Sequence, residues 1–352
     1  MVLDLSNGFN KIKGIEVVLI SLFDNDISNS YFDELDAGIE YHSLGKGRGF
    51  DPGILLKLFS LLKRIKADIV HTHINAFEYA LPYRIMNRKV RHFHTLHSVA
   101  KIECPSKILK SLRWVFYKFR RVVPVTISQI CSETFREYYK LNCDNIIFNG
   151  RYPLSPTLQL AQIQARYSKA NYGHHFLFVN VANIVHLKNQ ELMIQSLLET
   201  NRRTNEKCLL LIIGEHKDAA LTQHLKNLSN NNPYIIFTGQ QSNIADYLSF
   251  ADAFCLSSHF EGMPISLVEA FSMGCIPICT PAGGIKNMID NEVNGFISAD
   301  FTVESYSNLM LSFIGNRNKP AIMENGKKEF SGKYHIDISI SKHLKLYGAI
   351  PY

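Results

Sequence analysis

Apolar runs alternate with amphipathic stretches along most of this chain. Short runs rich in Val, Ile and Leu predict buried strands, and apolar residues spaced three or four positions apart predict helices. The predicted strands are 16–23, 67–71, 90–94, 124–127, 146–148, 176–181, 209–214, 235–239, 253–256 and 276–279. The predicted helices are 1–10, 54–65, 76–86, 128–139, 191–199, 264–273, 285–289 and 339–347. This alternation predicts an α/β fold with parallel sheets, which bind ligands beyond the carboxyl ends of their strands.

The length of 352 residues suits two domains. The segment 151–168 carries Pro153 and Pro156 and little periodicity, so we predict the interdomain linker there. The predicted first domain is 1–155 and the second is 170–330. Residues 331–352 form a tail that includes the last predicted helix.

The richest local pattern lies between a buried strand and the helix that follows it. The chain there reads SSHFEGMPISLVEAFSMG, with Glu261 in the loop, Pro264 at the helix start and Glu269 inside the helix. A helix start presents backbone N–H groups and the positive end of its dipole, which suit a phosphate. Carboxylates accept hydrogen bonds from hydroxyls, so the two acids suit a ligand with hydroxyls on either side of its phosphate.

The Glu-x7-Glu spacing of Glu261 and Glu269, the downstream Gly283-Gly284 and the Asn294-Gly295-Phe296 turn together resemble the signature of retaining glycosyltransferases of family 4. The resemblance implies a GT-B fold, in which two Rossmann-like domains face each other across a cleft. It also implies transfer of a sugar from a nucleotide diphosphate sugar, by analogy a UDP-sugar, to a hydroxyl. The anomeric configuration would be retained.

The resemblance also implies roles for single residues. Glu269 would hold the ribose hydroxyls, Ile244 would lie near the edge of the base, and His97 would orient the transferred sugar. The sugar would be held by Glu261 and by the backbone of Gly262, Met263, Pro264 and Ile265. The leaving phosphate would take the proton of the acceptor in a front-face mechanism.

Lys188 lies where a predicted strand gives way to a helix, from which a cation can reach a phosphate. The family pattern has a lysine here and usually an arginine five residues earlier, where this chain has Asn183. One cation for the diphosphate is therefore missing. His186 is a partial substitute only, because imidazole is mostly neutral at pH 7.

Four histidines, His71, His73, His94 and His97, fall at or just after the predicted ends of strands. A histidine at such a place more often packs or caps than reacts. We keep that interpretation for the first three. His97 is the candidate, since the segment HTLHS resembles the family segment whose histidine meets the sugar.

The chain opens with a predicted helix, whereas a parallel α/β domain normally opens with a strand and a glycine-rich turn. We therefore expect the first strand of the first domain to be missing, together with a loop that borders the diphosphate in the family. That strand would be central in a doubly wound order, so its absence would leave two neighbouring strands with unpaired edges. A mis-assigned start and a shortened variant both fit this pattern.

Composition narrows the class of protein. The seven cysteines show no C-x-x-C spacing, which indicates reduced thiols rather than disulfides or a zinc site. No apolar stretch of about 20 residues and no signal-peptide pattern occur, so we expect a cytoplasmic protein. No cofactor is expected, because the nucleotide-sugar is a substrate. No metal is expected either, since no ligand-type cluster accompanies the predicted phosphate site.

The net charge of +7 comes from the first half of the chain, and eleven cations face the single acid Glu103 between Arg84 and Arg121. A predicted helix in this region carries Ile108, Leu112, Val115, Phe116 and Phe119 on one face, with cations off it. Such a helix suits peripheral contact with an anionic membrane. A core-facing helix with solvated cations fits equally well. Nucleic acid is disfavoured because no recognition module accompanies the charge.

The predicted partners are a nucleotide-sugar donor and a saccharide or lipid-linked saccharide acceptor, as in surface polysaccharide synthesis. A non-catalytic, degenerate glycosyltransferase-like protein remains the alternative, given Asn183 and the missing strand. A nicotinamide oxidoreductase is disfavoured because no G-x-G-x-x-G follows a predicted strand.

Overall fold

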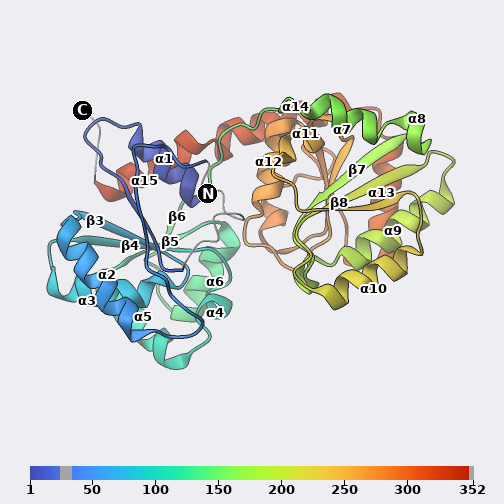
Figure 1. Cartoon of the computed structure of the whole chain (residues 1–352). Coiled ribbons are helices and arrows are strands. Elements are labelled where there is room, and N and C mark those ends of the chain that lie inside the picture. The colour runs from blue at the N-terminus through green and yellow to red at the C-terminus, as the bar shows by residue number, and fades with distance from the viewer. Residues whose placement is uncertain (24–33, 349–352) are drawn as a thin grey trace. The chain divides into compact units, whose positions relative to one another are not determined.

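A computed structural model describes residues 1–23 and 34–348 of the chain. The chain divides into two compact units (Figure 1). Unit 1 comprises Met1–Gly150 and Ile336–Tyr352, and unit 2 comprises Arg151–His335. The C-terminal segment therefore returns to the unit in which the chain began. The last four residues of the predicted tail lie outside the described residues.

Unit 1 is built of parallel strands and helices in alternation. Its strands are β1 (Val18–Ser21), β2 (Glu40–Ser43), β3 (Ile69–His73), β4 (Arg91–Leu96), β5 (Val123–Thr126) and β6 (Asn145–Ile146). Its helices are α1 (Val2–Asn10), α2 (Pro52–Ile65), α3 (Ala76–Met86), α4 (Ala100–Glu103), α5 (Lys107–Lys118), α6 (Gln129–Tyr139) and α15 (Ile336–Tyr347). Helix α1 packs against α15, so the two ends of the described chain meet.

The parallel strands of unit 1 lie in two sheets. Strand β1 pairs only with β2 among the described residues, and a separate sheet has the order β3-β4-β5-β6. Both sheets nevertheless contribute to one apolar layer, in which Ile20 of β1, Leu22 just after it and Val70 of β3 pack with α2 and α3. Among the described residues, β1 and β3 are each paired on one side.

Unit 2 is a doubly wound domain around one parallel sheet of order β12-β11-β10-β7-β8-β9. Its strands are β7 (Phe176–Val181), β8 (Cys208–Ile213), β9 (Ile235–Gly239), β10 (Ala253–Leu256), β11 (Ile276–Cys279) and β12 (Phe296–Ile297). Its α-helices are α7 (Leu160–Arg166), α8 (Lys169–Tyr172), α9 (Gln190–Arg203), α10 (Ala219–Ser229), α11 (Ile244–Phe250), α12 (Ile265–Met273), α13 (Val303–Gly315) and α14 (Lys319–Glu329). Strands β8 and β10 are fully buried, so helices cover both faces of the sheet (Figure 1).

Shorter helical turns complete unit 2. They are the 3₁₀ turns η3 (His186–Lys188) and η4 (Gly283–Asn287) and the π-helical turn η5 (Phe330–Tyr334). The segment expected to be a patternless linker contains α7, whose contacts with α11 tie it to unit 2. The apolar positions of α7 are too few to stand out in the sequence, because its one buried residue is Ile163.

Helix α5 and the residue after it expose most of the apolar face that the sequence pattern presents, but not Phe116. Ile108, Val115 and Phe119 are 81%, 42% and 64% exposed. The side that faces the core instead carries Arg113, Phe116 and Tyr117. Arg113 tolerates burial because its guanidinium donates to both carboxylate oxygens of Glu78 on α3, at 2.6 and 3.0 Å. Helix α5 thus packs on the core of unit 1 through this side and exposes its cations Lys107 and Lys118. Contact of its exposed side with a membrane stays a prediction.

Candidate functional site

The strand order of unit 2 reverses between β7 and β10. Chain order runs outward from β7 through β8 to β9, and on the other side from β10 through β11 to β12. Ligands of doubly wound domains bind beyond the carboxyl ends of strands at this reversal. The loops after β7 and β10 are joined there, since Ser257 Oγ donates to the carbonyl of Asn189 at 2.7 Å and His259 N donates to that of Leu187 at 2.9 Å.

Lys188 and Glu261 meet at this reversal. The Nζ of Lys188 lies 2.6 Å from Oε1 of Glu261, although 73 residues separate them in the sequence. The Oγ of Ser258 donates to the same carboxylate oxygen at 2.6 Å. The Glu261 side chain is 9% exposed and that of Lys188 is 24% exposed. The pair thus places a partly exposed cation and a largely buried carboxylate at the edge where a ligand would bind.

The glycine pair of the motif holds the loop of Glu261. Gly283 has φ +51°, and a Cβ there would lie 2.2 Å from the carbonyl oxygen of Glu261, so a side chain would not fit. The N–H of Gly284 donates to that carbonyl at 2.8 Å. Asn294 closes a separate turn, accepting from Asp290 N at 2.8 Å. The glycine pair therefore shapes the backbone of the site, and Asn294 shapes the turn at 290–294.

Helix α12 begins directly after the Glu261 loop. Pro264 is its N-cap residue rather than a residue of its first turn, and no side chain caps the helix start. Uncapped N–H groups at a helix start, with the positive end of the dipole, suit an anion. Met263 and Pro264 are buried, while Gly262 and Ile265 are partly exposed. This segment is therefore partly open to solvent at its two ends and buried in its middle.

Glu269 pairs with an arginine that the sequence analysis overlooked. The Nε of Arg151 lies 2.9 Å from Oε1 of Glu269 on α12, and their side chains are 14% and 11% exposed. Arg151 is the first residue of unit 2 and stands in the segment expected to be a linker. Its contact with Glu269 spans 118 residues. No local pattern in the sequence marks Arg151 as part of the site, because it stands in a segment without periodicity.

Two other candidates lie on neighbouring elements. Asn183 follows β7, and its side-chain oxygen accepts from the N–H of Glu215 at 3.2 Å, so this amide links the loops after β7 and β8. The Asn183 side chain is exposed. Ile244 is the first residue of α11 and is half-buried. Their proposed contacts with a nucleotide stay predictions.

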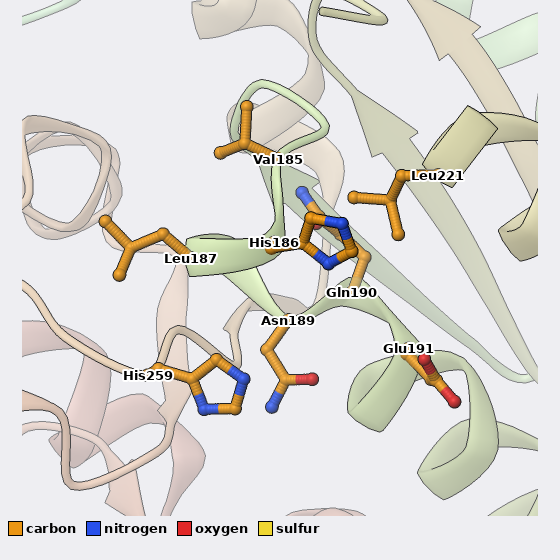
Figure 2. Close-up of a pocket in the computed structure, with 8 residues that line it drawn as sticks. All are labelled: Val185, His186, Leu187, Asn189, Gln190, Glu191, Leu221 and His259. Carbon is orange, nitrogen blue, oxygen red and sulfur yellow. The ribbon is translucent and has the colours of Figure 1, made fainter. Parts of the chain in front are cut away.

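A pocket of about 370 Å³ lies beside Lys188 on the same loop. Figure 2 shows its lining, which is drawn from the loop after β7, the starts of α9 and α10, and the loop after β10. The lining residues are Val185, His186, Leu187, Asn189, Gln190, Glu191, Leu221 and His259. Neither Lys188 nor Glu261 lines it. His186 does line it, and its imidazole Nε2 lies 3.8 Å from Asp218. The imidazole is thus not placed beside the Lys188–Glu261 pair.

His97 lies in unit 1, just after β4. Its Nε2 is 2.9 Å from Nδ1 of His73, and its backbone N–H donates to Glu103 at 2.8 Å. Burial lowers the pKa of His97 to about 4, so the imidazole is neutral at pH 7. A neutral imidazole with one nitrogen engaged has its second nitrogen as a single donor or acceptor for a hydroxyl.

His71 and His94 make contacts that fit a packing role. His71 hydrogen-bonds to Tyr347 of α15 and, through Nε2 at 2.7 Å, to Thr95 of β4. His94 is fully buried and its Nδ1 lies 3.0 Å from Thr72 Oγ1. These contacts agree with the packing role expected for His71 and His94. His73 differs, because it contacts the candidate His97.

Three further features of the described residues concern metal-ligand groups, cysteines and membrane-spanning helices. In residues 1–23 and 34–348, no three His, Cys, Asp or Glu side chains are grouped so as to hold a metal ion. All seven cysteines are free thiols. No helix of the described chain has the length and apolarity needed to cross a membrane.

Two family models match this chain. The model described as glycosyl transferases group 1 matches residues 162–330, and the model described as glycosyltransferase family 4 matches residues 1–149. The two matches fall on unit 2 and unit 1, respectively.

Sequence relatives are glycosyltransferases. N-acetyl-alpha-D-glucosaminyl L-malate synthase of Bacillus anthracis is 24% identical over 76% of this chain and 70% of its own length. UDP-Gal:alpha-D-GlcNAc-diphosphoundecaprenol alpha-1,3-galactosyltransferase of Escherichia coli is 23% identical over 83% of this chain and 78% of its own.

Solved glycosyltransferase structures have the same fold. A glycosyltransferase from Rickettsia africae is similar with a TM-score of 0.82 at 18% identity, covering 98% of this chain and 92% of its own. HepE of Anabaena in complex with UDP-glucose is similar with a TM-score of 0.78 at 13% identity, covering 99% and 95%. The fold and the two family matches together show that this chain belongs to the family 4-type glycosyltransferases of GT-B fold.

Proposed function

We propose that this glycosyltransferase takes its sugar from a UDP-sugar and transfers it, with retention, to a hydroxyl of a lipid-linked saccharide in surface polysaccharide synthesis. The observation that carries the donor site is the 2.6 Å contact between Lys188 and Glu261 beside the uncapped start of α12. UDP as the nucleotide is supported by the HepE complex with UDP-glucose and by the UDP-Gal in the name of the Escherichia coli relative. The diphosphoundecaprenol in that name supports a lipid-linked acceptor.

The chemistry follows from the charges of the site. When a sugar nucleotide binds, the Lys188 ammonium turns from Glu261 to the diphosphate, and the N–H groups at the start of α12 share its negative charge. Glu261 is then available to accept hydrogen bonds from sugar hydroxyls. As the bond between C1 and the phosphate oxygen breaks, charge develops on the leaving UDP, and the fixed cation stabilises it.

The new bond forms between C1 and the acceptor oxygen on the face from which UDP leaves. The acceptor proton passes to the departing phosphate oxygen, so atoms and charge balance without a protein base. Lys188 and the helix start supply the stabilisation that a metal gives in other transferases, and we therefore propose activity without a metal or cofactor. Neutral His97 contributes a hydrogen bond to the sugar.

Product stereochemistry tests this proposal. The protein would be incubated with a UDP-sugar and a lipid-linked or soluble saccharide acceptor in the presence of EDTA, and the product analysed by NMR. An α-linked product from an α-linked donor is expected. A β-linked product would contradict retention, and activity restored only by Mg²⁺ or Mn²⁺ would contradict metal independence.

A second candidate, a non-catalytic glycosyltransferase-like protein, rests on Asn183. The asparagine replaces a cation and its side chain is occupied by the N–H of Glu215. Such a protein would release no UDP from any UDP-sugar. Slow UDP release without acceptor therefore separates the two functions.

Contact with a membrane is supported by the exposed face of α5. Ile108 and Phe119 are mostly exposed, and Lys118, Arg120 and Arg121, which flank Phe119 in the sequence, are exposed as well. Each apolar side chain gains about 1.5–3 kcal/mol on full burial, and each cation about 1 kcal/mol near an anionic surface. The helix and the turn after it therefore fit the surface of an anionic bilayer.

Charge reversal tests the membrane contact. We expect the triple variant K118E/R120E/R121E to sediment with phosphatidylglycerol-containing vesicles at least about tenfold more weakly than the wild type, because three attractions become repulsions. The matched control reverses three exposed lysines of unit 2, in the variant K217E/K226E/K328E. Equal losses in both triple variants, or no loss in the first, would contradict a specific role of α5.

A further inference from the structure

The ion pair between Arg151 and Glu269 is held from two directions. The backbone N–H of Arg151 donates to the carbonyl of Tyr334 at 3.0 Å, and Arg151 forms a parallel bridge with His335. The ring of Tyr334 is buried and stacks on Phe271, which follows Glu269 by two residues on α12. The backbone of Arg151 and the helix that carries Glu269 are thus attached to the same residue, Tyr334.

This arrangement restricts where the Glu269 carboxylate can point. Glu269 lies in the second turn of α12, and a glutamate side chain has several rotamers of similar energy. An arginine whose own backbone is fixed, and whose Nε is 2.9 Å from Oε1, favours one of them. Removing the arginine would leave a largely buried carboxylate without this partner, and the side chain would turn to find another.

We propose that Arg151 is a positioning residue: it orients Glu269 toward the hydroxyls of the ribose in a bound nucleotide. The inference rests on the proposed function, in which Glu269 accepts hydrogen bonds from that ribose. Under this inference the preference of the enzyme for ribonucleotides over deoxyribonucleotides depends on Arg151, a residue that need not touch the nucleotide itself.

The test compares three probes, UDP, 2′-deoxy-UDP and 3′-deoxy-UDP, by isothermal titration calorimetry. Hydrogen bonds to a charged acceptor give the wild type an expected preference for UDP of about 10- to 100-fold over at least one deoxy probe. In R151Q this ratio is expected to fall to about threefold or less. In E269Q the ratio is expected to fall to the same extent. In the double variant R151Q/E269Q it is expected to fall no further than in either single variant.

A structural role alone would give another result. If R151Q bound all three probes more weakly but kept the wild-type ratio, Arg151 would only support the fold and the inference would be overturned. The matched control R166Q changes an exposed arginine of α7 and is expected to keep the ratio. If R151Q did not fold, R151K would replace it. R151K keeps the charge without the planar guanidinium, so its ratio is expected to fall partway, and an unchanged ratio would overturn the inference.

Failure of the proposed function looks different. A folded wild type that bound none of the three probes would contradict the UDP site as a whole. A wild type that bound UDP and both deoxy probes equally would remove the ribose role of Glu269. The role of Arg151 is decided by whether R151Q and R151K keep or lose the preference for UDP over a deoxy probe that the wild type shows.

Discussion

Replacing Lys188 by alanine is expected to lower kcat/KM for sugar transfer by at least about a thousandfold. Removing one preorganised group that stabilises developing charge costs about 10²–10³ in kcat. Loss of a charge-assisted contact to the diphosphate weakens UDP binding by a further factor of about 10 to 100. Initial rates of UDP release and calorimetric titration with UDP measure the two effects separately.

The control for Lys188 must separate charge at the site from charge on the surface. K226A removes an exposed lysine of α10 and is expected to change neither quantity. K188R keeps a cation and is expected to retain part of the activity. K188A also removes one of the two contacts of Glu261 described above and leaves the contact with Ser258. Loss of a partner of a buried carboxylate can destabilise the fold, so the melting temperature of each variant must be measured. Unchanged UDP affinity in a folded K188A protein would contradict the phosphate role of Lys188.

Unit 1 is expected to lose stability as the pH falls from 7 to 5. Burial lowers the pKa values of His92 and His94 to about 3 and that of His343 to about 4. In the unfolded chain these histidines titrate near 6.5. Below that pH these histidines bind protons in the unfolded state but not in the folded state. Their contribution to the free energy of unfolding is therefore fully present above about pH 6.5 and is lost as the pH falls toward the folded pKa values.

The size of this acid effect follows from the separation of the two pKa values. Each of the three histidines lowers the free energy of unfolding by about 1.4 kcal/mol per pH unit below 6.5, or by about 2 kcal/mol at pH 5. Calorimetric melting at pH 7 and pH 5 measures the loss. H94N keeps a side chain that can hydrogen-bond to Thr72 but cannot titrate, and we expect its stability to fall less steeply with pH.

An exposed histidine is the control for the acid effect. H224N replaces an exposed histidine in unit 2 and is expected to leave the pH dependence as in the wild type. Equal slopes for H94N and the wild type would show that His94 is not buried neutral. No change in the melting of the wild type between pH 7 and pH 5 would contradict the neutral state of all three.

The α/β alternation could be predicted because helices and strands bury their apolar residues with different periods. Strands β7, β9 and β11 and helix α3 have the bounds that the sequence predicts. Strand β3 begins two residues later than expected, since the ends of a short apolar run do not mark where pairing starts. Strand β2 went unpredicted because it reads EYHS, with no buried residue.

Contacts between distant residues limit what the sequence reveals of the site. Lys188 and Glu261 could be proposed as neighbours because each follows a strand, and parallel strands end at one edge. Arg151 could not, because nothing local shows that a residue in a proline-containing segment faces α12. The buried side of α5 was not predicted for the same reason, since the burial of Arg113 depends on Glu78 of another helix.

The central claim is that Lys188, Glu261 and Glu269 serve one bound sugar nucleotide. UDP release from a panel of UDP-sugars without acceptor, measured for the wild type, K188A and E261Q, tests it most directly. We expect slow release from at least one UDP-sugar by the wild type and loss of at least about 90% of that rate in both variants. A folded wild type that released UDP from none of them, or variants that released it at the wild-type rate, would contradict the account.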